Sequence, residues 1–211
     1  MRFGGGKSTI QKAARDAPQT LTRHSSGFEQ FCAVIQKSEM LSILDMSGAS
    51  QANIMFITGF GHRISSDDVI GTMQQVFGAD FLGSQQAASM SQRFLEQVLT
   101  FGDETFDGAL VWDVLQFLTS PVLEETVKQL LRVMRPGGVI LAFFNADEKV
   151  TQIPIYNYRI QDPKTILAVP RGGNQRAQYF NNRMIERLFE KASSVKFFLT
   201  RDHMREVIVR K

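Results

Sequence analysis

Two polar sites each come at the end of a strongly apolar segment of the chain. Residues 108–114 are apolar up to Trp112 and Asp113, and Asn145 follows the wholly apolar residues 139–144. Segments of this kind are typical of strands that are buried on both faces of a parallel sheet. An open parallel sheet binds its ligands at the carboxyl ends of its strands. Asp113 and Asn145 are therefore candidate ligand-binding residues.

The element that must position these two residues is the helix between them. Pro136-Gly137-Gly138 ends this helix, which the sequence predicts over residues 122–134. Its apolar residues recur at helical spacing: Leu123, Val127, Leu130, Leu131 and Met134. Two buried strands joined by a helix form a parallel β-α-β unit. Such a unit brings the carboxyl ends of its two strands to the same edge of the sheet.

The same stretch resembles a known family. FDGALVWDVLQFL, then LLRVMRPGG and an apolar strand, is similar to the passage from the fourth to the fifth strand of class I S-adenosylmethionine-dependent methyltransferases. The resemblance implies a Rossmann-like, doubly wound α/β fold. Its sheet is mostly parallel, with an antiparallel final strand. It also implies S-adenosylmethionine as cofactor and Trp112 and Asp113 as contacts to the cofactor or the substrate. Trp112 has an alternative role as a core aromatic residue.

The resemblance directs attention to the loop that follows a predicted strand at residues 40–44. In most of the family this loop reads D-x-G-x-G-x-G, whereas here it reads DMSGASQ from Asp45. Only small residues are retained, and the resemblance implies that they contact the cofactor together with Asp45: Ser47, Gly48, Ala49 and Ser50. The alternative is a tight turn with no ligand. Ser50 is also a candidate N-cap for a helix over residues 52–60.

Two acidic residues, Asp67 and Asp68, lie 22 and 23 positions beyond Asp45, at the end of a second predicted strand. An acidic residue at about this distance commonly binds the ribose hydroxyls of a nucleotide cofactor. We expect one of the pair, Asp68 in the first place, to bind ribose. The other would cap the helix that begins near residue 69. Residues 69–105 contain no apolar segment that predicts the family's third strand.

The C-terminal part predicts a β-hairpin inserted at about residues 153–170, followed by a helix and two closing strands. Insertions at this position in the family often shape the substrate pocket. The candidate substrate-binding residues are Asn145, Tyr156, Tyr158 and Arg159. Exposure on an edge hairpin explains the last three equally well.

Bulk properties set the limits of the interpretation. The 211 residues suit a single domain over residues 25–211, preceded by a flexible basic arm at residues 1–24. The single cysteine, Cys32, excludes a disulfide framework and a cysteine-based zinc site, and we expect a cytoplasmic protein. Net charge is −8 over residues 25–154 and +7 over residues 155–211, which permits nucleic-acid binding but favours pairing of charges within the molecule.

These features lead to two hypotheses. The first is an S-adenosylmethionine-dependent methyltransferase that acts on a small molecule, with no assigned catalytic residue, no metal ion and an unknown oligomeric state. The second is a methyltransferase-like binding or assembly module that has lost catalysis. The substituted glycines and the absence of a clear third strand motivate the second hypothesis.

Overall fold

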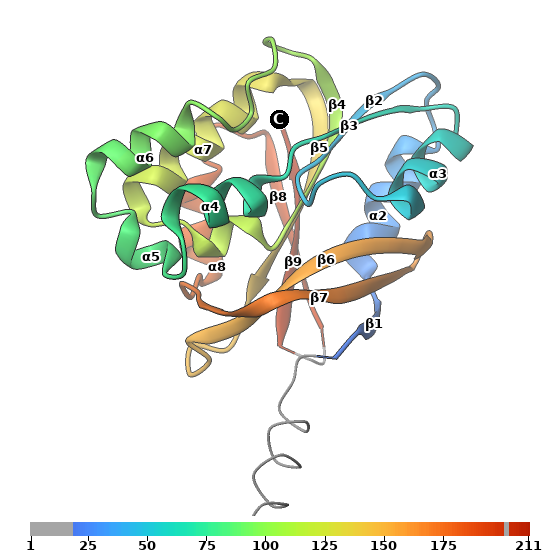
Figure 1. Cartoon of the computed structure of the whole chain (residues 1–211). Helices are drawn as coiled ribbons and strands as arrows, with labels where there is room; N and C mark the ends of the chain where they lie inside the picture. The colour runs from blue at the N-terminus through green and yellow to red at the C-terminus, as the bar shows by residue number, and fades with distance from the viewer. Residues whose placement is uncertain (1–18, 201–202) are drawn as a thin grey trace, which may run out of the picture.

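A six-stranded sheet forms the centre of the molecule in the computed structural model, which describes residues 19–200 and 203–211 (Figure 1). Its strands lie in the order β3 (Arg63–Ser66), β2 (Ser42–Asp45), β4 (Phe106–Trp112), β5 (Met134–Asn145), β9 (Met204–Arg210) and β8 (Ser194–Leu199). The first four strands are parallel, and β9 runs antiparallel to both β5 and β8. The predicted mostly parallel α/β fold with an antiparallel closing strand is confirmed.

Helices cover both faces of this sheet because the side chains of the central strands alternate between two cores. In β5, Val139, Leu141 and Phe143 belong to one core, and Ile140, Ala142 and Phe144 belong to the other. The first core packs under α2 (Ser26–Ile35) and α3 (Gln51–Gly59), which lie at the right of Figure 1.

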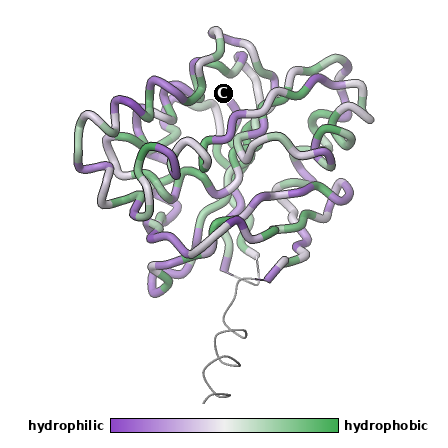
Figure 2. The backbone as a smooth tube through the Cα atoms, viewed as in Figure 1, coloured by the Kyte–Doolittle hydropathy of each residue, from purple (hydrophilic) through white to green (hydrophobic). Residues whose placement is uncertain are grey.

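The second core packs under the helices at the left of Figure 1. These helices are α4 (Val69–Phe77), α5 (Phe81–Ser84), α6 (Ala88–Leu95), α7 (Ser120–Val133) and α8 (Asn182–Leu188). A short 3-10 helix, η1 (Val114–Phe117), follows β4. The strands at the centre are largely hydrophobic, whereas hydrophilic segments recur along the outer helices (Figure 2).

No strand lies between β3 and β4 within the described part of the chain. Helices α4, α5 and α6 fill this stretch because its apolar residues have helical spacing, as Val69, Met73 and Phe77 illustrate. The family's third strand is therefore missing, and β3 forms one edge of the sheet.

A second, three-stranded sheet lies across the lower front of the molecule in the order β1 (Leu21–His24), β7 (Thr165–Arg176) and β6 (Gln152–Asp162). Strands β6 and β7 form a hairpin at the predicted place, and β7 continues beyond residue 170 to Arg176. The arm expected over residues 1–24 needs a correction. Leu21–His24 is a strand because the backbone of these residues pairs with the outer edge of β7, from Thr165 to Ala168. Residues 1–18 of that arm lie outside the described residues.

Candidate functional site

The carboxyl edge of β2 and β4 centres on the buried side chain of Asp45, at the end of β2. Its Oδ1 accepts hydrogen bonds from the Ser47 backbone N–H at 3.0 Å, the Ser47 hydroxyl at 2.9 Å and Trp112 Nε1 at 2.8 Å. Its Oδ2 accepts one from Asn53 Nδ2 at 2.6 Å. Burial raises the pKa of Asp45, and the hydrogen bonds from Asn53, Trp112 and Ser47 oppose that rise. Protein donors therefore surround both oxygens of this carboxylate.

Asp68 contacts the loop that follows Asp45. Ser47 forms an isolated antiparallel bridge with Asp68. Gly48 has φ +86°, in the left-handed region that favours glycine. A Cβ added to Gly48 would lie 3.2 Å from the side chain of Asp68. The side chain of Asp68 therefore packs directly against Gly48. Of the other expected contacts, Ala49 is exposed and Ser50 makes no side-chain capping bond to α3.

Asp68 and Asp67 are both engaged within the protein. Asp68 caps α4 by accepting the Gly71 N–H at 2.9 Å, and its two oxygens form a bidentate ion pair with Arg171 of β7. Asp67 accepts the Leu99 N–H at 2.7 Å, and burial raises its pKa. We expected one aspartate to cap the helix and the other to bind ribose. The structure gives the cap to Asp68, and both carboxylates have partners from the protein.

Asn53, in the first turn of α3, joins this edge to the hairpin, a role that the sequence did not predict. Its Nδ2 donates to Asp45 Oδ2 and, at 3.0 Å, to the Tyr158 carbonyl, and its Oδ1 accepts the Ile160 N–H at 2.8 Å. Asn53 is fully buried. One feature of the sequence could have indicated this role: Asn53 is an amide side chain eight positions after Asp45, within an otherwise apolar segment. Strand β6 is thereby held directly against the start of α3.

An aromatic stack continues this contact at the end of β4. The rings of Trp112 and Tyr158 are nearly parallel, with centroids 5.0 Å apart, and both side chains are buried. Phe28 and Phe143 pack around Trp112 at 6.1 Å and 5.7 Å. The Trp112 backbone has φ +56°, a conformation that costs roughly 1–2 kcal/mol in a residue other than glycine. Trp112 therefore lies in the core, which was the alternative role considered for it.

Asp113 is buried behind the stack, and burial raises its pKa to about 7. Burial and the neighbouring charge of Asp113 hold the pKa of Tyr158 well above its usual value. The carboxyl and the phenol of this pair are both buried.

The remaining substrate candidates have different neighbours in the structure. Asn145 closes its own loop: its Nδ2 donates to the carbonyls of Asp147 and Val150, and its Oδ1 accepts the Asp147 N–H. Tyr156 lies beside Tyr158, with ring centroids 6.2 Å apart, whereas Arg159 is exposed.

The residues expected to hold S-adenosylmethionine therefore already have partners within the protein. Asp45 and Asp68 accept hydrogen bonds from protein donors, and Asn53 connects the start of α3 directly to β6. No group of three His, Cys, Asp or Glu residues is placed to hold a metal ion within residues 19–200 and 203–211.

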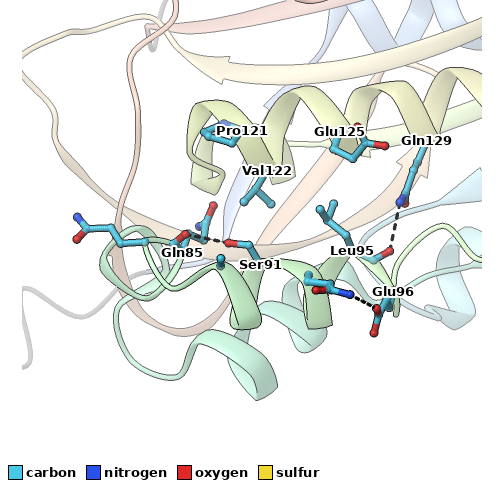
Figure 3. A pocket seen from close by; sticks show the side chains of 11 residues that line it. Gln85, Ser91, Leu95, Glu96, Pro121, Val122, Glu125 and Gln129 are labelled. Carbon is cyan, nitrogen blue, oxygen red and sulfur yellow. Dashed lines mark hydrogen bonds between the residues drawn. The ribbon is translucent and has the colours of Figure 1, made fainter.

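A separate groove of about 550 Å³ lies between α6 and α7 (Figure 3). Leu95 and Val122 supply apolar walls, and Glu96, Glu125 and Gln129 supply polar groups. None of the residues predicted from the sequence to bind cofactor or substrate lines it.

Ion pairs connect the basic C-terminal quarter to the acidic body. Arg171 pairs with Asp68, Arg176 with Asp80, and Lys164 with Glu29. The pairing lowers the pKa of the exposed Asp80 carboxyl. These contacts support pairing of charges within the molecule, which the sequence favoured over nucleic-acid binding. No helix in the described part of the chain is long and apolar enough to cross a membrane.

Comparisons with known proteins agree with this fold. The family model described as "Methyltransferase domain" matches residues 48–142, from the loop after β2 into β5. The solved structure of the PH0226 protein from Pyrococcus horikoshii OT3 shares 12% identity with this chain, with a TM-score of 0.52, and the match covers 97% of this chain and 92% of that one. At this identity the likeness establishes the fold alone.

Two further solved structures are similar at lower TM-scores. One is 1,6-didemethyltoxoflavin-N1-methyltransferase from Burkholderia thailandensis, with 14% identity, a TM-score of 0.48, and coverage of 96% of this chain and 82% of that one. The other is the N-methyltransferase NodS from Bradyrhizobium japonicum WM9, with 12% identity, a TM-score of 0.46, and coverage of 88% and 85%. Both contain bound S-adenosylhomocysteine. No curated protein matches the sequence. The family match and the fold together confirm the resemblance predicted from the sequence.

Proposed function

Because this chain carries a domain of the class I S-adenosylmethionine-dependent methyltransferase family, we propose that it works as a binding or assembly module that does not use the family's cofactor. One observation carries the proposal. Asn53 connects Asp45 of the cofactor edge directly to the backbone of β6, where the family would place a ligand. The edge that gives the family its activity is here part of the protein core.

The energetic cost of reopening this edge supports the proposal. Five apolar or aromatic side chains of the hairpin are at most 5% exposed: Ile155, Tyr158, Ile160, Ile166 and Ala168. Full burial stabilises a large apolar side chain by about 1.5–3 kcal/mol, so exposing the three isoleucines alone costs roughly 5–9 kcal/mol. A ligand at a concentration 1,000 times its Kd stabilises the form that binds it by only about 4 kcal/mol. Cofactor binding would not offset the loss of the hairpin contacts.

Calorimetric titration tests the proposal directly. The full chain is titrated with S-adenosylmethionine and, separately, with S-adenosylhomocysteine, up to millimolar concentration. We expect no saturable heat and no rise in the thermal midpoint with either ligand. A saturable heat with one-to-one stoichiometry would overturn the proposal.

A second candidate function is methyl transfer to a small molecule in the cytoplasm, with S-adenosylmethionine as cofactor. The family match favours it, and so does Asp113. Burial raises the pKa of this carboxyl to about 7, a value that suits a general base. If this second function is correct, the titration gives a saturable heat. Asp68→Ala, which removes the residue expected to bind the ribose, then weakens cofactor binding. Arg171→Ala, which removes only the partner of Asp68, would leave or strengthen the binding.

A further inference from the structure

No strand of residues 19–200 and 203–211 pairs with the outer edge of β8. Strand β8 ends the six-stranded sheet and pairs with β9 through six consecutive residue pairs without a register shift. The strand contains no proline and only one charged residue, Lys196. Its last residue, Leu199, is 71% exposed. A regular, apolar edge of this kind is a template for a further strand.

The pairing with β9 determines which backbone groups of β8 point outward. The N–H of Thr200 donates to the carbonyl of Met204 at 2.9 Å, so these two residues form a hydrogen-bonded pair in continuation of the β8–β9 ladder. Hydrogen-bonded and non-hydrogen-bonded pairs alternate along an antiparallel ladder. The N–H and C=O groups of Val195, Phe197 and Leu199 therefore point away from β9.

From this edge we infer that β8 pairs with β8 of a second copy of the chain, antiparallel, about a two-fold axis at Phe197. This register places Val195 opposite the Leu199 of the other copy and Phe197 opposite its own counterpart. All three outward-facing residues then occupy hydrogen-bonded pairs.

The side chains complement one another in this register. Lys196 lies on the same face of β8 as Phe198, with its Nζ 5.0 Å from the centroid of the ring. Across the axis, Lys196 faces the Phe198 ring of the second copy, a favourable cation–π partner, and no two lysines face each other. On the other face, Leu199 is covered by Val195, and the two Phe197 rings meet. The pairing joins two six-stranded sheets into one continuous sheet, and it does not depend on whether the cofactor binds.

Opposite residues in a hydrogen-bonded antiparallel pair have Cα atoms about 5.5 Å apart, within the range that a disulfide spans. We therefore expect Phe197→Cys to form a disulfide-linked dimer under mild oxidation. Leu199→Cys is the matched control because two copies of residue 199 lie roughly 13 Å apart along the strands. The native Cys32 does not interfere, since burial raises the pKa of its thiol to about 12. Cross-linking of Leu199→Cys to the same extent as Phe197→Cys would overturn the register.

The solution mass tests the interface without cysteines. Light scattering after gel filtration should give twice the 23.8 kDa mass of one chain. Leu199→Pro removes an outward N–H and keeps the β9 ladder, so we expect it to halve the mass with an unchanged circular dichroism spectrum. Met55→Lys removes an exposed apolar residue on α3, a helix that contacts β3 at the opposite edge of the sheet from β8, and should leave the mass unchanged. A monomeric wild-type chain, or a dimer that survives Leu199→Pro, would refute the inference.

Discussion

Replacing Asn53 by alanine tests the contact that closes the cofactor edge. The substitution removes one buried amide and leaves three groups without its hydrogen bonds: Asp45 Oδ2, the Tyr158 carbonyl and the Ile160 N–H. Alanine is a good helix former, so the backbone of α3 should tolerate the change. The expected effect therefore comes from the lost hydrogen bonds.

The size of the effect follows from burial. Asn53 and Asp45 are both 0% exposed, so water does not replace the lost donor without disturbing the packing. An unsatisfied buried polar group costs about 1–3 kcal/mol. Three such groups, partly relieved by relaxation, predict a loss of roughly 3–5 kcal/mol in the free energy of unfolding. This is a large part of the 5–15 kcal/mol that is typical of a whole domain.

Urea denaturation monitored by fluorescence measures this loss. Trp112 is the only tryptophan in the chain, and its ring stacks on Tyr158 and bonds to Asp45. Its emission therefore reports on the same edge that Asn53 holds together. We expect a lower midpoint at an unchanged slope, as for a loss of stability without a change in the surface exposed on unfolding.

Thr58→Ala is the matched control within α3. Its hydroxyl donates to the Ile54 carbonyl of its own helix at 2.7 Å and is exposed. We expect a change of less than about 0.5 kcal/mol, as for an ordinary surface substitution. If Asn53→Ala lowers the free energy of unfolding no more than Thr58→Ala does, the Asn53 amide does not hold the hairpin against the cofactor edge.

Three further predictions concern the same edge. Burial raises the folded pKa of Asp113 from 3.8 to about 7, so its charged form opposes folding and stability falls as pH rises from about 4 to 7. Asp113→Asn should remove this decline and stabilise the protein at pH 8 by roughly 2–4 kcal/mol in urea titrations, and an unchanged pH profile would contradict it. Arg171→Ala should cost at most about 1 kcal/mol, because its ion pair with Asp68 is partly exposed, and should create no S-adenosylmethionine heat in calorimetry. Gly48→Ala should lower the thermal midpoint more than Gly61→Ala, because both glycines have positive φ but only Gly48 also meets Asp68; equal losses would disprove that contact.

Local patterns in the sequence were sufficient to predict the scaffold. The apolar stretches around β4 and β5, the helical spacing within α7 and the Pro136-Gly137-Gly138 stop predicted a parallel β-α-β unit, and the structure contains it. The absence of an apolar strand between Asp68 and Phe106 predicted the shortened sheet edge. These features depend on neighbours within a few residues, where periodicity and chain stiffness are informative.

Only tertiary contacts decided which groups bond to the residues of the cofactor edge. Asn53 bonds to Ile160, which lies 107 positions away, and Arg171 pairs with Asp68, which lies 103 positions away. The sequence identified Asp45, Asp68 and Trp112 as residues at a ligand edge, but each of them could equally have had a ligand or a protein group as its partner. No local pattern specifies where a distant hairpin packs, because that position depends on the fit of its buried side chains against the finished sheet. That packing places Tyr158 on Trp112 and buries both rings in one core cluster.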